Sequence, residues 1–117
     1  MQVRDGFRLG DLLVGPTAGH VLRPDGLQRL PARAAEALVA LAEQPGRAVA
    51  REDLRNRLWP DGTGSDDALV RCIGELRHVL GDRRRTHRYV ETVGRQGYRL
   101  VLEPAPLSAE ERAQLES

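Results

Sequence analysis

Residues 66–100 read DDALVRCIGELRHVLGDRRRTHRYVETVGRQGYRL, and this stretch decides the fold. Apolar side chains recur every three or four positions in its first half, which predicts an amphipathic helix over residues 66–80. The apolar positions are Leu69, Ile73, Leu76 and Leu80. Either Ser65 or Asp66 is suited to cap this helix at its N-terminus, and Gly81 is suited to end it. The opposite helix face is polar and free to meet solvent or a partner.

The second half of the stretch predicts a β-hairpin. Two runs rich in β-branched and aromatic residues occupy 89–93 and 98–102, and Gly94-Arg95-Gln96-Gly97 joins them. Glycine-containing connections of this length between two such runs are typical of hairpins.

Upstream residues predict a small antiparallel sheet and two more helices. Turn residues divide residues 7–30 into four short apolar runs, which are typical of strands in such a sheet. Alanine and leucine then recur at helical spacing, with Pro31 expected at the first helical position and Pro45-Gly46 at the end. The remaining elements are a short extended piece at 48–50, a helix over 51–59 and a loop over 60–65.

Two helices joined by a turn and followed by a hairpin are the order of a winged helix-turn-helix. We therefore expect an α+β fold with an N-terminal four-stranded antiparallel sheet, three helices and a C-terminal hairpin wing. Residues 1–102 are expected to form this domain, and residues 103–117 an acidic, proline-containing linker or tail.

Charges are unevenly distributed along the chain. Its 117 residues include 18 Arg, no Lys and 17 acidic residues, so the net charge is only +1. Residues 69–101 hold 8 Arg against 3 acidic residues, whereas residues 102–117 hold 1 Arg against 4. The third helix and the hairpin are therefore expected to form one basic surface. Arginine can grip phosphate and guanine edges with paired hydrogen bonds, which favours a nucleic-acid partner.

Composition and spacing exclude several other classes. The single cysteine, Cys72, cannot form an intramolecular disulfide, which is typical of a reducing cytoplasm. No apolar run approaches the roughly 20 residues of a membrane helix, and the first residues lack the apolar core of a signal peptide. Cys72, His78 and His87 are too few and too poorly spaced to bind zinc, and no phosphate-binding loop motif is present. We expect neither an enzyme nor a cofactor.

Four short motifs make the chain resemble a known family. They are PGRAVAREDL at 45–54, LWP at 58–60, LRHVLGD at 76–82 and YVETVGRQGYRL at 89–100. Together they closely resemble the OmpR/PhoB-type C-terminal effector domain, over residues 7–102. The place of the domain at the start of the chain and its Glu91-Thr92-Val93 wing most resemble the CadC/ToxR-like one-component regulators. Receiver-linked response regulators are the alternative branch.

This resemblance implies sequence-specific binding of double-stranded DNA by the effector domain of a bacterial transcription regulator. Helix 66–80 is expected in the major groove and wing 89–102 on the adjacent minor groove or backbone. The implied location is cytoplasmic, and the CadC/ToxR-like branch adds a tether to the cytoplasmic face of the inner membrane in the full-length protein. Loop 60–65 corresponds to the segment through which family members contact RNA polymerase. We expect a monomer in solution that dimerises on half-sites about one helical turn apart.

The expected DNA-binding residues come from the end of the second helix, the third helix and the wing: Trp59, Asp67, Arg71, Glu75, Arg77, His78, Thr92, Arg95, Gln96 and Tyr98. Arg71 is the leading candidate to read a guanine edge, and Arg95 to enter a narrow minor groove. The structural alternatives are an Arg71–Glu75 ion pair, a bracing role for Arg77 and a core role for Trp59.

Other features leave a choice open. The basic run from Arg83 to Arg88 either attracts phosphate or is a solvated loop, and His78 is either a phosphate contact or an ordinary surface side chain. Gly74 and Glu75 stand where the family often has basic residues. Together with the modest net charge, they favour a rival hypothesis in which the winged helix binds a protein instead of DNA.

Overall fold

The structure is a computed structural model that describes residues 1–83 and 88–116. The elements, in chain order, are the 3₁₀ helix η1 (Val3–Asp5), strands β1 (Phe7–Leu9), β2 (Leu12–Gly15), β3 (His20–Arg23) and β4 (Gly26–Arg29), helix α1 (Ala32–Ala42), strand β5 (Val49–Ala50), helices α2 (Arg51–Leu58) and α3 (Asp66–Leu80), strands β6 (Val90–Val93) and β7 (Gly97–Leu100), and helix α4 (Ala109–Glu116). The predicted α+β order of elements is confirmed.

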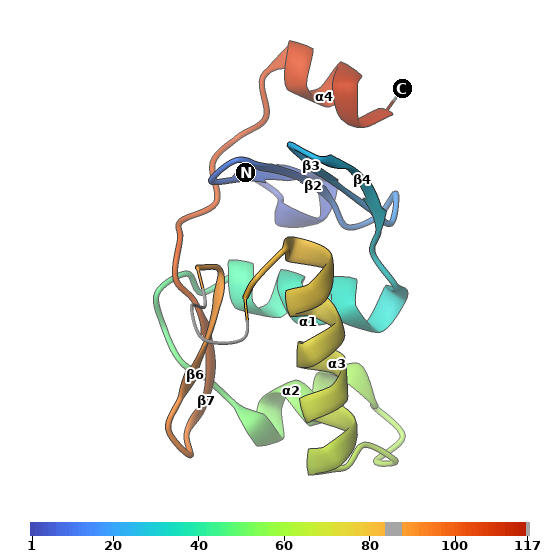
Figure 1. Cartoon of the computed structure of the whole chain (residues 1–117). Coiled ribbons are helices and arrows are strands. Elements are labelled where there is room, and N and C mark those ends of the chain that lie inside the picture. Colours follow the sequence, from blue (N-terminus) through green and yellow to red (C-terminus); the bar gives the residue numbers. More distant parts are fainter. Residues whose placement is uncertain (84–87, 117) are drawn as a thin grey trace.

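Two small sheets flank the helices. Strands β1 to β4 form an antiparallel meander, and β5, β7 and β6 form a second sheet in which β7 is central. Figure 1 shows the four-stranded sheet lying across the molecule, with α1, α2 and α3 on one side of it and α4 on the other. The core lies between this sheet and the helices, because α1 is buried over nearly its whole length and α3 buries one apolar face.

Helix α3 is bounded by the residues that the sequence predicts. The Ser65 hydroxyl accepts a hydrogen bond from the Ala68 amide at 3.1 Å, which satisfies one of the free amides of the first turn. At the other end, Gly81 takes the left-handed conformation with φ 81°, and its amide donates to the carbonyl of His78. Both ends of α3 are thus set by local sequence.

Three predicted boundaries differ by one or two residues. Pro31 has an extended ψ of 153° and accepts from the Ala35 amide, so it caps α1 instead of starting it. Helix α2 ends at Leu58, because the residue before a proline, here Trp59, disfavours helical backbone. The wing strands are shorter than 89–93 and 98–102, and they include Gly97, which pairs with both neighbouring strands.

The C-terminal segment packs on the four-stranded sheet. Backbone hydrogen bonds join Arg8 and Ala105 in both directions, at 2.7 and 2.9 Å. Ser108 and Glu111 then cap α4 reciprocally, each side chain accepting from the other residue's amide. The division of the chain at residue 102 stays a prediction, and the described part of the segment includes a capped helix.

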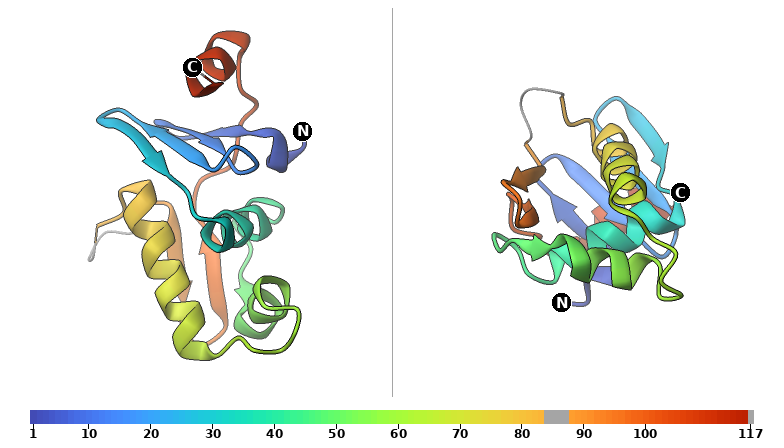
Figure 2. Two further views of the ribbon diagram at one scale, coloured as in Figure 1. Left: turned by 90° about the vertical axis from the view of Figure 1, so that its right-hand side faces the viewer. Right: turned by 90° about the horizontal axis from the view of Figure 1, so that it is seen from below.

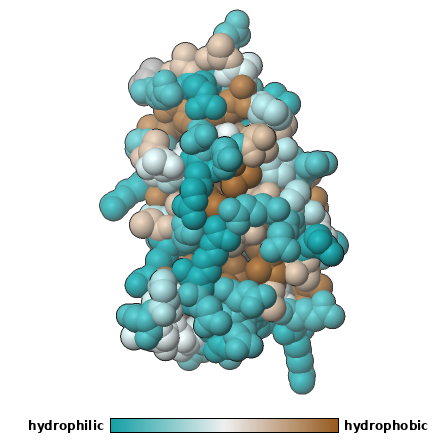
Figure 3. Space-filling model, turned by 180° about the vertical axis from the view of Figure 1, so that it is seen from behind, coloured by the Kyte–Doolittle hydropathy of each residue, from teal (hydrophilic) through white to brown (hydrophobic). Residues whose placement is uncertain are grey.

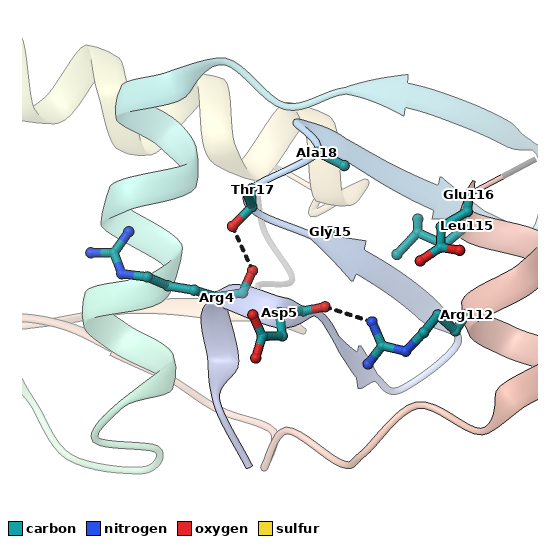
Figure 4. A pocket seen from close by; sticks show the side chains of 8 residues that line it. All are labelled: Arg4, Asp5, Gly15, Thr17, Ala18, Arg112, Leu115 and Glu116. Carbon is teal, nitrogen blue, oxygen red and sulfur yellow. Dashed lines mark hydrogen bonds between the residues drawn. The ribbon is translucent and has the colours of Figure 1, made fainter.

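Side chains of α4 point toward the sheet around a small surface pocket (Figure 4). Leu115 is buried where Gly6 and Gly15 have no side chains, and Arg112 donates to the Asp5 carbonyl at 2.9 Å. Three residues around this pocket, Arg112, Leu115 and Glu116, belong to α4, which lies on the side of the sheet away from α3 (Figure 1).

Glu36 links η1, α1 and α2 through two arginines. Its carboxylate accepts from Arg4 at 2.6 and 2.9 Å and from Arg57 Nε at 3.1 Å. The hydrogen bond from Arg4 holds the pKa of Glu36 below its ordinary value of 4.5, although partial burial opposes this shift. The charged carboxylate therefore stabilises the folded state above about pH 4.5, and this stabilisation is lost as the pH falls through the folded-state pKa.

Replacing Glu36 by Gln should therefore flatten the acid limb of stability. The free energy of unfolding of the wild type is expected to fall between about pH 5 and about pH 3 more steeply than that of Glu36→Gln. Urea denaturation at a series of pH values measures this difference. Glu103→Gln, which removes an exposed carboxylate, is the control and should keep the wild-type slope. Parallel pH profiles of wild type and Glu36→Gln would contradict the assignment.

Candidate nucleic-acid interface

Three elements meet at the end of the molecule opposite α4. Figure 1 shows the N-terminal half of α3, helix α2 and the tip of the β6–β7 hairpin at the lower end of the view, with α4 at the upper end. Seen from below in Figure 2, α3 and the hairpin stand beside one another, with α2 next to them. A helix and a hairpin tip on one side can contact the same long, grooved partner.

Exposed residues line the outer face of α3. They are Asp66, Asp67, Val70, Arg71, Gly74, Glu75 and His78. The opposite face is buried, and on the outer face Asp66 forms an ion pair with Arg55 of α2 at 3.2 Å. The predicted positions Asp67, Arg71, Glu75 and His78 are therefore brought together on one exposed surface, and their contact with DNA stays a prediction.

Arginines are neutralised unequally across the molecule. Five arginines near the four-stranded sheet, α1 and α2 pair with carboxylates: Arg4, Arg8, Arg23, Arg55 and Arg57. In the wing, Arg99 pairs with Glu91 at 2.9 Å. By contrast, Arg71 on α3 and Arg95 at the hairpin tip form no ion pair within the described ranges 1–83 and 88–116. The Arg71–Glu75 pair that was the structural alternative is thus not formed. Both guanidinium groups are available to an external anion.

Arg77 braces α3 against the wing. Its Nε donates to the Val90 carbonyl at 3.1 Å and its Nη2 to the Thr92 hydroxyl at 2.9 Å. Burial lowers the pKa of Arg77, and the nearby Tyr98 and Asp82 oppose that shift. These contacts correspond to the bracing alternative for Arg77. DNA contacts by Arg77 and Thr92 stay predictions.

Tyr98 is a core residue of the wing. It is only 3% exposed, and the guanidinium groups of Arg51 and Arg77 lie 5.5 and 5.8 Å from the centre of its ring. Arg51, the first residue of α2, also donates its amide to the Gln96 carbonyl at 3.3 Å. Tyr98 therefore joins α2, α3 and the wing, and burial leaves its ring little surface for a partner.

The hairpin tip is exposed. Gln96 donates its amide to the Val93 carbonyl at 2.9 Å and closes a tight turn. Gly94 has φ 49°, a left-handed conformation that suits glycine, so the turn presents Arg95 and Gln96 to solvent. This placement matches the sequence expectation for Arg95 and Gln96.

The link between α3 and the wing is held by Asp82. Its carboxylate accepts from the amides of Arg88 at 2.8 Å, Tyr89 at 3.0 Å and Val90 at 3.0 Å. The wing therefore starts from a fixed point after α3. The part of the basic run from 84 to 87 lies outside the described residues, and so does its candidate role in phosphate attraction.

Trp59 closes the turn between α2 and loop 60–65. The side chain is 8% exposed, and the Arg33 guanidinium lies 5.1 Å from its ring centre. Gly64 packs directly on the ring, since a Cβ there would lie 2.5 Å from it. Within the loop, the Asp61 carboxylate accepts from both the amide and the hydroxyl of Thr63. These contacts support the core role for Trp59, and a phosphate contact through its indole stays a prediction.

Sequence reasoning missed Val70 and Arg51. Val70 is 51% exposed on α3, and it was assigned to neither the apolar nor the polar face from the sequence. Arg51 was assigned only to a helix start, although a basic side chain at that position faces the wing once β5 pairs with β7. A helical wheel could have found Val70, whereas Arg51 requires the tertiary pairing.

The titratable groups of the described residues form no metal centre. No group of three or more His, Cys, Asp or Glu side chains is placed to hold a metal among the described residues. Burial, with a smaller contribution from Glu75, raises the pKa of the Cys72 thiol to about 11, so it stays protonated at neutral pH. No helix in the described part of the chain is long and apolar enough to cross a membrane.

The fold and this surface define a winged helix-turn-helix domain. The family described as transcriptional regulatory protein, C terminal, matches residues 27–100, and the chain belongs to this family. The match covers both α2 and α3 and the whole wing, and it confirms the OmpR/PhoB-type resemblance. This is a family of bacterial transcription-regulator domains and not an enzyme family.

Individual proteins agree with this assignment. The chain is 35% identical over 94 residues to the transcriptional regulator HilA of Salmonella typhimurium, which covers 75% of this chain and 17% of HilA. It is 35% identical over 75 residues to the cholera toxin transcriptional activator of Vibrio cholerae, 62% of this chain and 26% of that protein. The chain thus spans about a quarter or less of the curated relatives it matches.

Solved structures share the fold. The DNA-binding domain of Escherichia coli CadC superposes with a TM-score of 0.76 at 25% identity, covering 87% of this chain and 96% of that one. The response regulator DrrB of Thermotoga maritima, an OmpR/PhoB homologue, gives 0.73 at 26% identity over 86% of this chain and 49% of that one. The expectation of a transcription-regulator DNA-binding domain is therefore confirmed at the level of family and fold.

Proposed function

We propose that this domain binds double-stranded DNA with α3 in the major groove and the hairpin tip on the adjacent minor groove or backbone. The observation that carries the proposal is the pair of unneutralised arginines, Arg71 on α3 and Arg95 on the wing, at one end of the molecule. An α-helix fits the major groove, and arginine can bind the O6 and N7 acceptors of guanine there. Arg77 of α3 donates hydrogen bonds to Val90 and Thr92 of β6, and so holds the helix that carries Arg71 against the wing that carries Arg95.

The face seen from behind is consistent with a partner at this end. Figure 3 shows the face turned away from the view of Figure 1, where hydrophilic side chains dominate and hydrophobic ones appear in small separate areas. That face therefore lacks the large hydrophobic patch that a permanent protein partner would cover. The proposal further includes a monomer in solution that pairs on two half-sites, a contact between loop 60–65 and RNA polymerase, and action in the cytoplasm.

Mobility-shift titrations test the proposal directly. A preferred site is first selected from random duplexes, and its affinity is then compared with that of shuffled DNA at several salt concentrations. We expect a clear preference for the selected site and at least about a tenfold loss of affinity between about 50 and about 200 mM salt. Equal affinity for both sequences would remove the sequence-specific role. Failure to bind DNA or heparin at low salt would favour the protein-interaction module instead.

Two arginine substitutions should have different consequences. Arg71→Ala is expected to weaken the selected site by about 1–3 kcal/mol and to relax preference at one base pair. Arg95→Ala is expected to weaken all sequences by similar factors, because it contacts backbone or groove shape. Arg112→Ala removes the same charge from α4 at the opposite end and is the matched control. A loss for Arg112→Ala equal to that for Arg71→Ala would contradict the placement of DNA.

A further inference from the structure

Neither the backbone conformation nor a close contact among the described residues requires glycine at position 74. Gly74 lies in the middle of α3, its φ is not positive, and a Cβ built on it would meet no described atom within 4 Å apart from the backbone of its own helix. Glycine in a helix interior is less stable than alanine. The free domain would thus be more stable with alanine at this position, and the described residues leave the space above Gly74 open to a partner.

Val70 lies one helical turn before Gly74. It is the only large hydrophobic side chain that α3, whose residues are all described, leaves exposed, at 51%. Asp67, Arg71 and Glu75 surround the two residues on the same face. The polar face of α3 therefore contains one short nonpolar strip, made of Val70 and Gly74.

The major groove supplies a matching group. Among the four base pairs, only those containing thymine present a methyl group there, and apolar side chains contact it. A helix can come closest to the groove floor where it has no side chain, which is the situation at Gly74. The strip lies on the exposed face that the proposed function directs into the groove.

We propose that α3 approaches the base edges most closely at Gly74 and that the 5-methyl group of a thymine packs between Val70 and Gly74. This inference rests on the proposed function and adds a defined chemical feature to its DNA target. It makes Val70 and Gly74 specificity-determining residues alongside Arg71.

Uracil substitution isolates the methyl group. The site selected by the wild type is synthesised with each thymine replaced in turn by deoxyuridine, which keeps the base pair and removes only the methyl. At one position, deoxyuridine should weaken the wild type about fivefold and leave the affinity of Val70→Ala unchanged. Val101→Ala removes an exposed valine outside α3 and should respond to deoxyuridine as the wild type does.

Gly74→Ala should make the domain more stable but weaken its binding to DNA. Its Tm should rise by about 4 °C, because alanine favours the helix. Its affinity for the selected site should fall about tenfold, with a smaller loss on shuffled DNA.

Several outcomes overturn the inference while leaving the proposed function intact. One is a Gly74→Ala domain that binds the selected site as tightly as the wild type. Another is a deoxyuridine effect that is absent, or equal in the wild type and Val70→Ala. If the wild type does not distinguish selected from shuffled DNA, the proposed function fails and the inference fails with it.

Discussion

Gly97→Ala is expected to destabilise the domain by about 3 kcal/mol and to abolish DNA binding, because the wing and helices would lose their relative positions. A Cβ on Gly97 would lie 1.9 Å from the Val49 carbonyl oxygen and 2.9 Å from its carbon. Both are backbone atoms of β5, which cannot move away as a flexible side chain could. Strand β5 leads directly into α2, so its displacement also moves the helix that packs beside α3.

Urea denaturation followed by circular dichroism measures the loss of stability, and mobility shifts measure the loss of DNA binding. Gly94→Ala is the matched control, because it changes a glycine of the same hairpin whose Cβ would meet no described atom within 4 Å. It should cost about 1 kcal/mol from its left-handed backbone alone. Equal losses for the two variants would contradict the collision with β5.

Asp82→Ala should cost about 2–3 kcal/mol in the free energy of unfolding. The substitution leaves the amides of Tyr89 and Val90, both buried residues, without their charged acceptor. Hydrogen bonds to charged groups contribute more than neutral ones, and unsatisfied buried donors are costly. The start of the wing would then be free to shift relative to α3, which should weaken binding to the selected site more than the loss of one negative charge would strengthen it.

Asp82→Asn separates geometry from charge. Its amide oxygen can still accept one or two of the three hydrogen bonds, so its stability should lie between that of the wild type and Asp82→Ala. Chemical denaturation at neutral pH and DNA titration on the same samples provide both measurements. Wild-type stability in Asp82→Ala would show that the wing is positioned by other contacts.

The parts of the fold that could be predicted from the sequence are those set by local patterns. Helix α3 was predicted with its observed limits, because its periodicity, Ser65 cap and terminal Gly81 act within a few residues. The four strands of the first sheet followed from turn residues for the same reason. The packing of α4 on that sheet was not predicted, since it depends on the contact of Leu115 with strands distant in sequence.

The candidate site divides in the same way. The sequence by itself determined which side chains α3 and the hairpin tip present, since exposure along a helix or turn follows from its period. Only the tertiary structure decided which groups each arginine contacts. Arg77 donates hydrogen bonds to the wing, whereas Arg71, six residues earlier, has no carboxylate partner among the described residues. The physical reason is that a guanidinium donates hydrogen bonds to whatever acceptors the fold brings within reach, and no local pattern encodes those neighbours.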